Sequence, residues 1–393
     1  MHRPIAAFAL LLLSANSAAE FFGNVALEAQ HFSERAQFDD QFDDNLTLSF
    51  KPKWDGEWND GNDLWSFELF LRADDRDGGR EHADIREALW LHVDGDSEWR
   101  VGINTMFWGV TESQHLVDVI NQIDQVEGID GEDKLGQPML HLKRYQDWGV
   151  VDLLVLPGFR ERTFQEKQGR LRTPLVVDTD QAEYESSDED RHVDYALRFS
   201  QTWGDLDLGA SWFKGTSRDP LLLPGFDDSG NPVLIPFYQQ MTQLGVDAQL
   251  IAADWIWRLE FIRREAESND YSAYTAGFEY TFYGIMASAV DLGMLVEYSA
   301  DDRPEGEAGA FDNDVFLGAR FAFNDAQSSE ILAGFVVDSD NRSRTFRVEG
   351  NRRFGASWKG TLELQTFSNI DADDVLAAFE KDDFVLLEMA YYF

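Results

Sequence analysis

Hydrophobic and polar residues alternate in short segments along most of the chain. In the first segment, Val25, Leu27 and Ala29 alternate with polar residues. Because successive side chains of a β-strand point to opposite faces, this period of two predicts strands with one apolar and one polar face. About eighteen such strands are predicted, and sixteen is the alternative if one hairpin is miscounted. They lie around residues 24–30, 45–50, 65–71, 89–93, 99–103, 139–145 and 151–155, on both sides of 203–205, and at 244–248, 257–261, 278–282, 292–296, 315–321, 331–335, 346–348, 362–364 and 385–393.

The connections between these segments differ in length in a regular way. Long links at residues 111–138, 158–191 and 216–238 all follow odd-numbered strands, whereas most links after even-numbered strands are tight turns. An even strand count with long loops at one end is typical of an all-β transmembrane antiparallel β-barrel. Aromatic residues near strand ends fit interfacial girdles: Trp99, Trp148, Trp203, Trp255, Tyr283 and Trp358. An exported soluble β-sandwich or propeller is the alternative fold.

The two ends of the chain predict its location. The last strand ends on Tyr391 and Phe393, and a terminal Phe after alternating apolar residues resembles the signal that the barrel-assembly machinery recognises in bacterial outer-membrane barrels. At the other end, a basic start, an apolar run and small residues up to Ala19 predict a signal peptide over residues 1–19. Residues 20–393 then form an integral barrel in contact with outer-membrane lipid and lipopolysaccharide. A retained signal-anchor helix is the alternative, although the run is short for a membrane span.

Composition removes several classes of partner and chemistry. The chain has 33 Lys+Arg and 73 Asp+Glu, for a net charge of -40, yet 44% of its residues are hydrophobic. Such a charge repels nucleic acid, and the absence of cysteine removes thiolate chemistry. Acidic runs at residues 74–77, 178–180 and 188–190 lack a complete calcium-loop spacing. We therefore expect solvated loop charge there, with no metal and no cofactor.

A barrel of this strand number has an interior too wide for side chains alone to fill, so it holds water or a folded-in loop. Charged residues of both signs occupy the inward positions. The predicted pore-lining residues are Arg198, Arg258, Glu260, Arg320, Arg347, Glu349, Lys359 and Glu363. Because arginines concentrate after Arg198, this wall is the predicted contact for anions. The alternative is a solvated lumen in which neighbouring charges pair across strands.

Residues 100–143 carry three motifs: Asn104-Thr-Met-Phe-Trp-Gly109, His115-Leu-Val-Asp-Val-Ile-Asn121 and Gly128-Ile-Asp-Gly-Glu-Asp-Lys134. This segment resembles uncharacterised proteobacterial outer-membrane porins and, more distantly, the DUF1302 and alginate-export type barrels. The resemblance implies a channel for export or uptake. An exporter of a polyanion needs a strongly basic lumen, and acids abound in this chain, so we do not expect alginate as the cargo.

Residues 107–135 are predicted to fold into the lumen and narrow it, because the link is far longer than a hairpin needs. Leu116, Val119, Ile120 and Ile123 recur at helical spacing, which predicts a short amphipathic helix against the wall. The candidate constriction residues are Trp108, Glu112, Asp118, Asn121, Asp124 and Asp130. We expect the four acidic residues to face Arg198, Arg258, Arg320 and Arg347. The alternative is an ordinary loop that caps the rim.

Catalysis has little support in the sequence. Histidines at positions 31, 82, 92, 115, 141 and 192 are scattered, and none lies in a motif such as Gly-x-Ser-x-Gly. We therefore expect no enzyme. The sequence predicts a porin-like outer-membrane channel for passive passage of small or oligomeric polar solutes. The alternative is a non-conducting surface barrel whose extracellular loops bind a ligand or partner, and the oligomeric state is left open.

Overall fold

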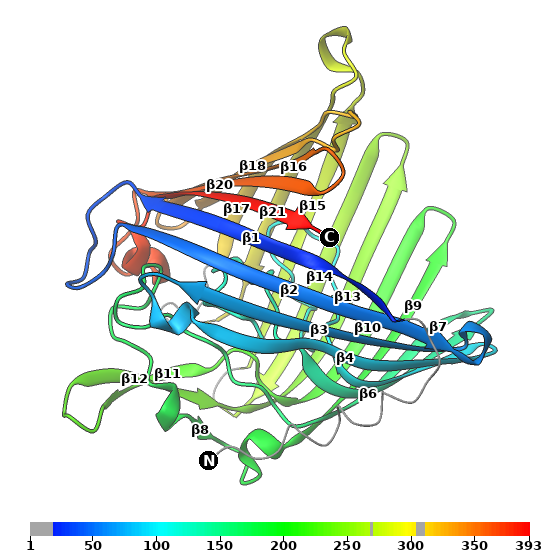
Figure 1. Ribbon diagram of the computed structural model, residues 1–393, viewed down its shortest axis with the longest axis horizontal. Helices are drawn as coiled ribbons and strands as arrows, with labels where there is room; N and C mark the ends of the chain where they lie inside the picture. The colour runs from blue at the N-terminus through cyan, green and yellow to red at the C-terminus, as the bar shows by residue number, and fades with distance from the viewer. Residues whose placement is uncertain (1–18, 268–269, 304–310) are drawn as a thin grey trace.

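The fold is a closed antiparallel β-barrel (Figure 1). The computed structural model describes residues 19–267, 270–303 and 311–393. In this part of the chain, eighteen strands form one sheet, and β1 (Glu20–Phe32) closes it by pairing with both β2 (Asp44–Trp58) and β21 (Phe384–Tyr392). The predicted all-β barrel of about eighteen strands is confirmed. The predicted signal peptide falls almost entirely on residues 1–18, outside the described residues.

Each barrel strand pairs with the barrel strands that come before and after it in the sequence. The strands β8, β11 and β12 belong to a small separate sheet. Between β2 and β21 the barrel strands are β3 (Asp63–Asp74), β4 (His82–Asp94), β5 (Ser97–Asn104), β6 (Gln137–Gln146), β7 (Gly149–Pro157), β9 (Val193–Trp203), β10 (Leu206–Thr216), β13 (Gln240–Ala252), β14 (Trp255–Ala266), β15 (Tyr271–Phe282), β16 (Asp291–Asp301), β17 (Asn313–Ala322), β18 (Glu330–Asp338), β19 (Arg344–Phe354) and β20 (Trp358–Ser368).

A three-stranded sheet lies at the long-loop end of the barrel and was not predicted. It consists of β8 (Glu183–Tyr184), β11 (Leu221–Phe226) and β12 (Pro232–Tyr238), so the link at 216–238 contains a hairpin. Short 3-10 segments are η1 (Asn59–Gly61), η2 (Gly78–Arg80), η3 (Thr179–Gln181), η4 (Glu189–Arg191), η5 (Ile285–Ala287) and η6 (Val375–Phe379). Across the described ranges, no helix is long and apolar enough to cross a bilayer.

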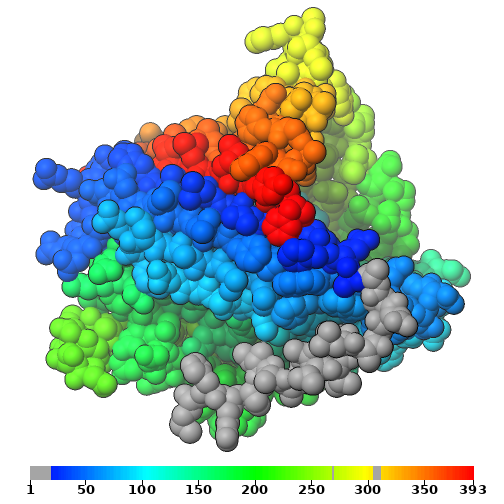
Figure 2. Space-filling model, viewed as in Figure 1, coloured from blue at the N-terminus to red at the C-terminus, as the bar shows by residue number. Residues whose placement is uncertain are grey.

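The terminal strand seals the barrel against the first strand. Asn24 lies opposite Tyr392 and Phe32 opposite Phe384, and the Phe393 amide donates to the Gly23 carbonyl at 3.1 Å. Figure 2 shows the blue N-terminal and red C-terminal strands side by side on one face of the molecule. Both chain ends of the barrel therefore lie at the short-turn end.

Aromatic side chains gather on the outer surface near the short turns. Trp255 stacks on Trp257 with ring centroids 5.6 Å apart, and Trp358 lies 5.0 Å from Tyr391. The six strand-end aromatics named in the sequence analysis are all exposed. An outward band of this kind fits the interfacial aromatics of membrane barrels, where an apolar ring body and a polar edge both find suitable surroundings.

Candidate functional site in the barrel lumen

The connection between β5 and β6 lies inside the barrel, and we call its residues 107–135 the insert. Glu260 on β14 binds it through both carboxylate oxygens. Oε1 accepts hydrogen bonds from the Val110 amide at 2.7 Å, the Thr111 amide at 3.1 Å and the Thr111 hydroxyl at 2.8 Å. Oε2 accepts from the Val117 amide at 3.1 Å. Because Glu260 is fully buried beneath the insert, it anchors the insert and does not line the open pore as the sequence analysis expected.

A second carboxylate, Glu297 on β16, holds the neighbouring residues of the insert. It accepts from the Glu112 amide at 2.9 Å, the Ser113 amide at 2.8 Å and the Ser113 hydroxyl at 2.6 Å. An irregular segment inside a barrel needs partners for its backbone N–H groups, because an unpaired buried amide is costly. The two wall carboxylates supply these partners where no secondary structure does.

The buried side of the insert is apolar. Val117, Val119 and Ile120 form a core with residues of the wall from β6 to β15, including Phe213 and Ile262. The insert therefore occupies the lumen along this wall as a dry interface, which stabilises it by removing apolar surface from water.

The predicted helix is wrong. Residues 116–123 form turns and bends, followed by an isolated bridge between Ile123 and Lys134. Asn121 explains the difference, because its side chain accepts from the Met106 amide at 2.9 Å and donates to the Leu135 carbonyl at 2.8 Å. A side-chain amide that bonds to distant backbone groups offers the chain an alternative to helical hydrogen bonds.

Four of the predicted constriction residues lie on the buried side of the insert. Trp108, Asp118, Asn121 and Asp124 are almost or fully shielded from water. Asp118 pairs within the insert with Lys134, at 3.3 Å, and the Arg198 guanidinium lies 5.3 Å from the Trp108 ring centroid. These side chains shape and anchor the insert without reaching the open space.

The expectation that all four acidic residues face the four named arginines is half wrong. Glu112 pairs with Arg320 and Asp130 with Arg347, each at 2.6 Å. The remaining two arginines have partners on the wall: Arg198 lies 2.7 Å from Asp247, and Arg258 lies 3.0 Å from Glu279. Glu279 lies on the strand next to that of Arg258, and Asp247 reaches Arg198 across Gly209 of the intervening strand β10. These wall carboxylates therefore take the ion pairs that the insert was expected to make.

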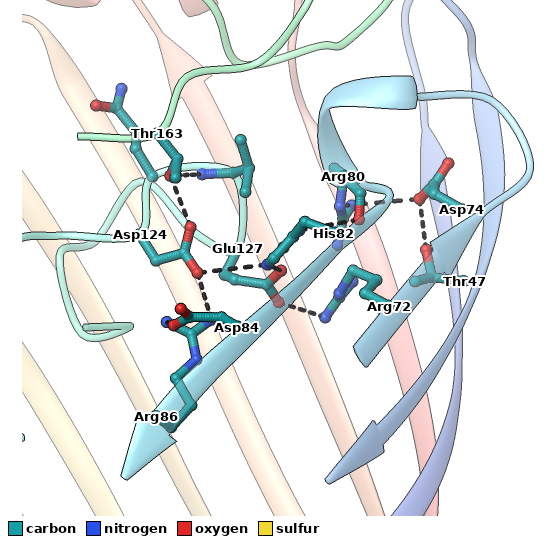
Figure 3. A network of polar contacts seen from close by, with 12 residues as sticks. Thr47, Arg72, Asp74, Arg80, His82, Asp84, Arg86, Asp124, Glu127 and Thr163 are labelled. Atoms are coloured by element: carbon teal, nitrogen blue, oxygen red, sulfur yellow. Dashed lines mark hydrogen bonds and ion pairs between the residues drawn. The ribbon is translucent and has the colours of Figure 1, made fainter. Parts of the chain in front are cut away.

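Asp124 and Glu127 of the insert enter a buried ion network with arginines of β3 and β4 (Figure 3). Asp124 pairs with Arg86 and accepts from the Thr163 hydroxyl at 2.6 Å, and Glu127 pairs with Arg72 at 2.6 Å. Burial alone would raise the pKa of Asp124, but the bonds from His82, Arg86 and Thr163 outweigh it and hold that pKa well below its usual range. The network fixes the far edge of the insert.

His82, Asp124 and Glu127 also have the donor atoms of a metal site. Their surroundings argue against that use, because guanidinium groups already neutralise the carboxylates: Arg72 bonds to Glu127 and Arg86 to Asp124. A cation placed among them would compete with fixed positive charges that are themselves buried. We assign the cluster to the docking of the insert.

Sequence analysis missed a second segment that covers the insert. Residues 158–178, which we call the covering loop, follow β7. Gln165 donates to the Gln125 carbonyl of the insert at 2.7 Å. Further along, Arg170 bonds to Asp382 at 2.6 Å and lies 4.4 Å from the Phe32 ring centroid. The loop thus reaches the wall formed by β1 and β21. The sequence signal that could have predicted this loop is the repetition of arginine within residues 160–172 of so acidic a chain.

The acidic run at residues 188–190 is exposed, as expected, whereas the other two runs are less solvated than expected. Asp74 and Asp77 are buried, and Asp74 accepts from the Arg76 and Asp77 amides at 2.9 Å each. Asp178 accepts from the Asp180 amide at 3.2 Å and so caps η3. These carboxylates stabilise loop backbone, as aspartates in turns commonly do.

The open part of the lumen lies between the insert and β17–β20. A cavity of about 830 Å³ occupies this space, and a second of about 450 Å³ lies between the insert and β2–β4. Phe107 and Glu132 of the insert line both cavities. Of the predicted pore-lining residues, Arg347 and Glu349 line the larger cavity, and Lys359 lies near the short-turn end of β20.

The arginines beside this cavity are surrounded by carboxylates. Arg320 lies 2.6 Å from Glu112, 3.0 Å from Glu330 and 3.7 Å from Glu279. Arg347 also has three carboxylate neighbours: Asp130 and Glu349 each lie 2.6 Å away, and Glu363 lies 3.2 Å away. The wall is therefore not a row of free positive charge, and the expected anion contact loses its basis.

Six histidines of the described residues pair with carboxylates. Each of the six rings lies within 3.6 Å of a carboxylate oxygen, and none of them receives a hydrogen bond from a serine or threonine hydroxyl. The carboxylate partners come from different parts of the barrel. A hydrolase of the serine type needs the base beside a nucleophile, and this arrangement is not present here.

Comparison with known proteins places the fold. The sequence matches no family model and no curated protein. The structure is similar to OmpTΔL8, a loop L8 deletion mutant of OmpT, an outer membrane protein of Vibrio cholerae, with a TM-score of 0.50 and 10% identity over 96% of this chain and 100% of that chain. A triple mutant of the Rh. blastica porin aligns with a TM-score of 0.47 and 11% identity, over 96% of this chain and all of the porin. The chain thus has the fold of the outer-membrane β-barrels.

Proposed function

We propose that this protein is a bacterial outer-membrane channel through which small or oligomeric polar solutes pass by diffusion. The observation that carries the proposal is the asymmetric filling of the lumen. The insert packs dry against the wall from β6 to β15, yet a cavity of about 830 Å³ remains beside β17–β20, and charged and polar side chains line it together with apolar ones. If the insert served only to close the lumen, we would expect no open space lined by polar groups beside it.

The channel prefers cations. Carboxylates outnumber guanidinium groups around Arg320 and Arg347, and the chain carries a net charge of -40. Fixed negative charge along a pore raises the local concentration of cations and excludes anions. This preference replaces the anion contact expected from the arginines alone.

Export and assembly follow from the same proposal. Residues 1–19 are removed as a signal peptide, and Tyr391 and Phe393 present the terminal strand to the barrel-assembly machinery. The outward apolar faces then contact lipid and lipopolysaccharide. The resemblance of residues 100–143 to the DUF1302 and alginate-export type barrels stays a prediction.

Deletion of the insert tests the channel. In planar bilayers, purified wild-type protein should show a conductance whose reversal potential favours cations. Replacing residues 107–135 by a short Gly-Ser turn should raise the conductance and relax solute size exclusion. Folding should survive, because the backbone hydrogen bonds of the barrel run between strands.

The control replaces the exposed turn between β11 and β12, residues 228–231, by a Gly-Ser turn and should leave conductance unchanged. If the insert deletion folds and alters neither conductance nor solute uptake, the insert does not narrow the pathway and the proposal is wrong in its main point.

The competing function is a non-conducting barrel that binds a ligand or partner at its surface. One observation favours it: the covering loop spans from β7 to the Asp382 region, above the insert. Absence of any single-channel conductance from heat-modifiable wild-type protein, with conductance appearing after deletion of residues 158–178, would select this alternative.

A further inference from the structure

We propose that the lumen cavity between the insert and β17–β20 is a binding site for amphiphilic organic cations, molecules with an aromatic or branched apolar body and an amine or quaternary ammonium group. The inference deepens the proposed function, because it names the class of solute that this part of the pathway recognises. It depends on the order of side chains along four adjacent strands.

An apolar row crosses the wall near its long-loop end. Phe316 on β17 lies opposite Val336 on β18, Val336 opposite Thr345 on β19, and Thr345 opposite Phe367 on β20. All four residues line the cavity. Leu376 and Phe379 cover one side of Phe367, and Thr345 is the polar member of the row. Inward positions of a water-filled barrel are ordinarily polar, so the apolar surface that this row leaves toward the cavity suits the apolar part of a solute.

Two glycines set the orientation of the aromatic ring in this row. A Cβ added to Gly334 would lie 2.4 Å from Cε2 of Phe316, and one added to Gly318 would lie 2.8 Å from Cε1. Gly318 and Gly334 are directly opposite each other in the register. The Phe316 ring therefore lies close against the backbone of the wall, in space that other residues would fill.

The next two inward-facing rows, farther from the long-loop end, contain charged residues. Leu332 lies opposite both Arg320 and Glu349, and Glu349 lies opposite Glu363, two rows farther from the loop end than Phe316. Arg347 belongs to the row between. The lining thus changes from apolar to charged along the strands, which matches a solute with an apolar body and an ionic end.

The insert and η6 complete the site on the other sides. Phe107 exposes 55% of its surface, and its ring stands edge-on to His115 with centroids 4.8 Å apart. His115 bonds to Glu132 at 2.8 Å. At the outer end Phe379 lies 5.9 Å from Phe367. An exposed aromatic ring beside a carboxylate suits an organic cation, which is attracted by the ring face and by the charge.

The charge of the lining favours a positive ligand. Four carboxylates and two guanidinium groups line the cavity, the carboxylates being Glu112, Asp130, Glu132 and Glu349 and the guanidinium groups Arg162 and Arg347. Arg162 is paired outside this set, with Asp219 at 2.6 Å. Each of the four carboxylates has a basic neighbour, but Arg347 is shared by Asp130, Glu349 and Glu363, so this cluster keeps an excess of negative charge. A cation is attracted by that excess, whereas an anion meets guanidinium groups that are already bonded. The volume of about 830 Å³ suits a small organic molecule.

Three probes separate the apolar and ionic parts of the proposal: benzyltrimethylammonium, tetramethylammonium and benzoate. Titration calorimetry on the purified full-length barrel in detergent should show the tightest binding for benzyltrimethylammonium. Tetramethylammonium, which keeps the charge and lacks the ring, should bind roughly tenfold more weakly. Benzoate, which keeps the ring and reverses the charge, should not bind. The same order should hold for block of single-channel current.

Variants locate the site. Phe107→Ala and Glu349→Gln should each weaken benzyltrimethylammonium binding by roughly three- to tenfold. Controls that leave the cavity intact are Leu317→Ala, the lipid-facing neighbour of Phe316, and Asp205→Asn in an exposed turn. Folding is checked by heat modifiability. If Phe107→Ala fails to fold, Glu349→Gln, whose side chain is 45% accessible, still carries the test.

The outcomes distinguish this inference from the channel proposal. Conductance without selective binding, equal binding of benzoate, or equal effects of site and control variants would overturn the inference and leave the channel. The opposite result is a barrel that never conducts but binds selectively, with weaker binding in the site variants. It would support the binding site and refute the channel function.

Discussion

The attachment of the insert to Glu260 gives a quantitative prediction. The carboxylate accepts four hydrogen bonds from the insert, and a glutamine in its place turns one oxygen into a donor that faces the Val117 amide. One bond is then lost and three become bonds to a neutral acceptor. With bonds to charged groups worth about 1.5–3 kcal/mol and neutral ones about 1 kcal/mol, Glu260→Gln should weaken docking of the insert by roughly 3–9 kcal/mol.

This loss changes how often the insert leaves the wall. At about 1.4 kcal/mol for each factor of ten, the ratio of undocked to docked insert should rise by roughly 10²- to 10⁶-fold. The chain has no cysteine, so a single Val119→Cys reports the change. Val119 is buried between insert and wall, and a thiol there reacts with a soluble reagent when the insert undocks.

The measurement is the rate of thiol modification in Val119→Cys protein with and without Glu260→Gln. Glu87→Gln is the control, because Glu87 pairs with Lys53 at 3.1 Å on a lumen-facing part of the wall without contacting the insert. We expect an acceleration of at least about 100-fold for Glu260→Gln and little change for the control. Equal rates in folded protein would refute the idea that this carboxylate anchors the insert.

Four further results are expected. A tag between Asp178 and Asp190 should be reached by antibody on intact cells, and one at residues 94–97 should not, since long loops face outward; the reverse pattern would invert the topology. Deleting Phe393 should preserve export but lower the amount of heat-modifiable barrel; unchanged assembly would leave the residue as a girdle aromatic only. Replacing Arg320 and Arg347 by Ser should shift the reversal potential further toward cations, and a shift toward anions would contradict the charge argument. Burial and the nearby Asp74 and Glu166 raise the pKa of Asp77 to about 6, so its loop should resist proteolysis better at pH 5 and lose this protection as pH rises through 6; Asp77→Asn should remove the dependence, and a pH effect that persists in that variant would exclude Asp77 as its source.

The barrel itself could be predicted from the sequence. The period of two is a local property, since each side chain follows the pleat of its own strand, and Val25, Leu27 and Ala29 show it without reference to any other segment. The contrast between tight turns and long links is local as well. These signals sufficed for a barrel of about eighteen strands and for the long segment after β5, whereas the pairing of β21 with β1 came from the structure.

Tertiary structure decided what the lumen contains. Asn121 bonds to backbone groups on both sides of its segment and so replaces the helix that the spacing of Leu116 and Ile120 suggests. Glu260, expected in the open pore, is buried because the insert brings backbone amides to it. Partners of this kind are far apart in sequence, by 150 residues for Val110 and Glu260, and no periodicity along the chain records them.

The charged residues also separate what the sequence determines from what the tertiary structure decides. Sequence composition establishes that acids outnumber bases, but the meaning of an arginine in the lumen depends on its nearest carboxylates. Arg198 is taken by Asp247 on a nearby strand, whereas Arg347 reaches Asp130 of the insert. Because Coulomb energy falls with separation and rises as water is excluded, only the folded arrangement determines which arginines remain to act on a solute.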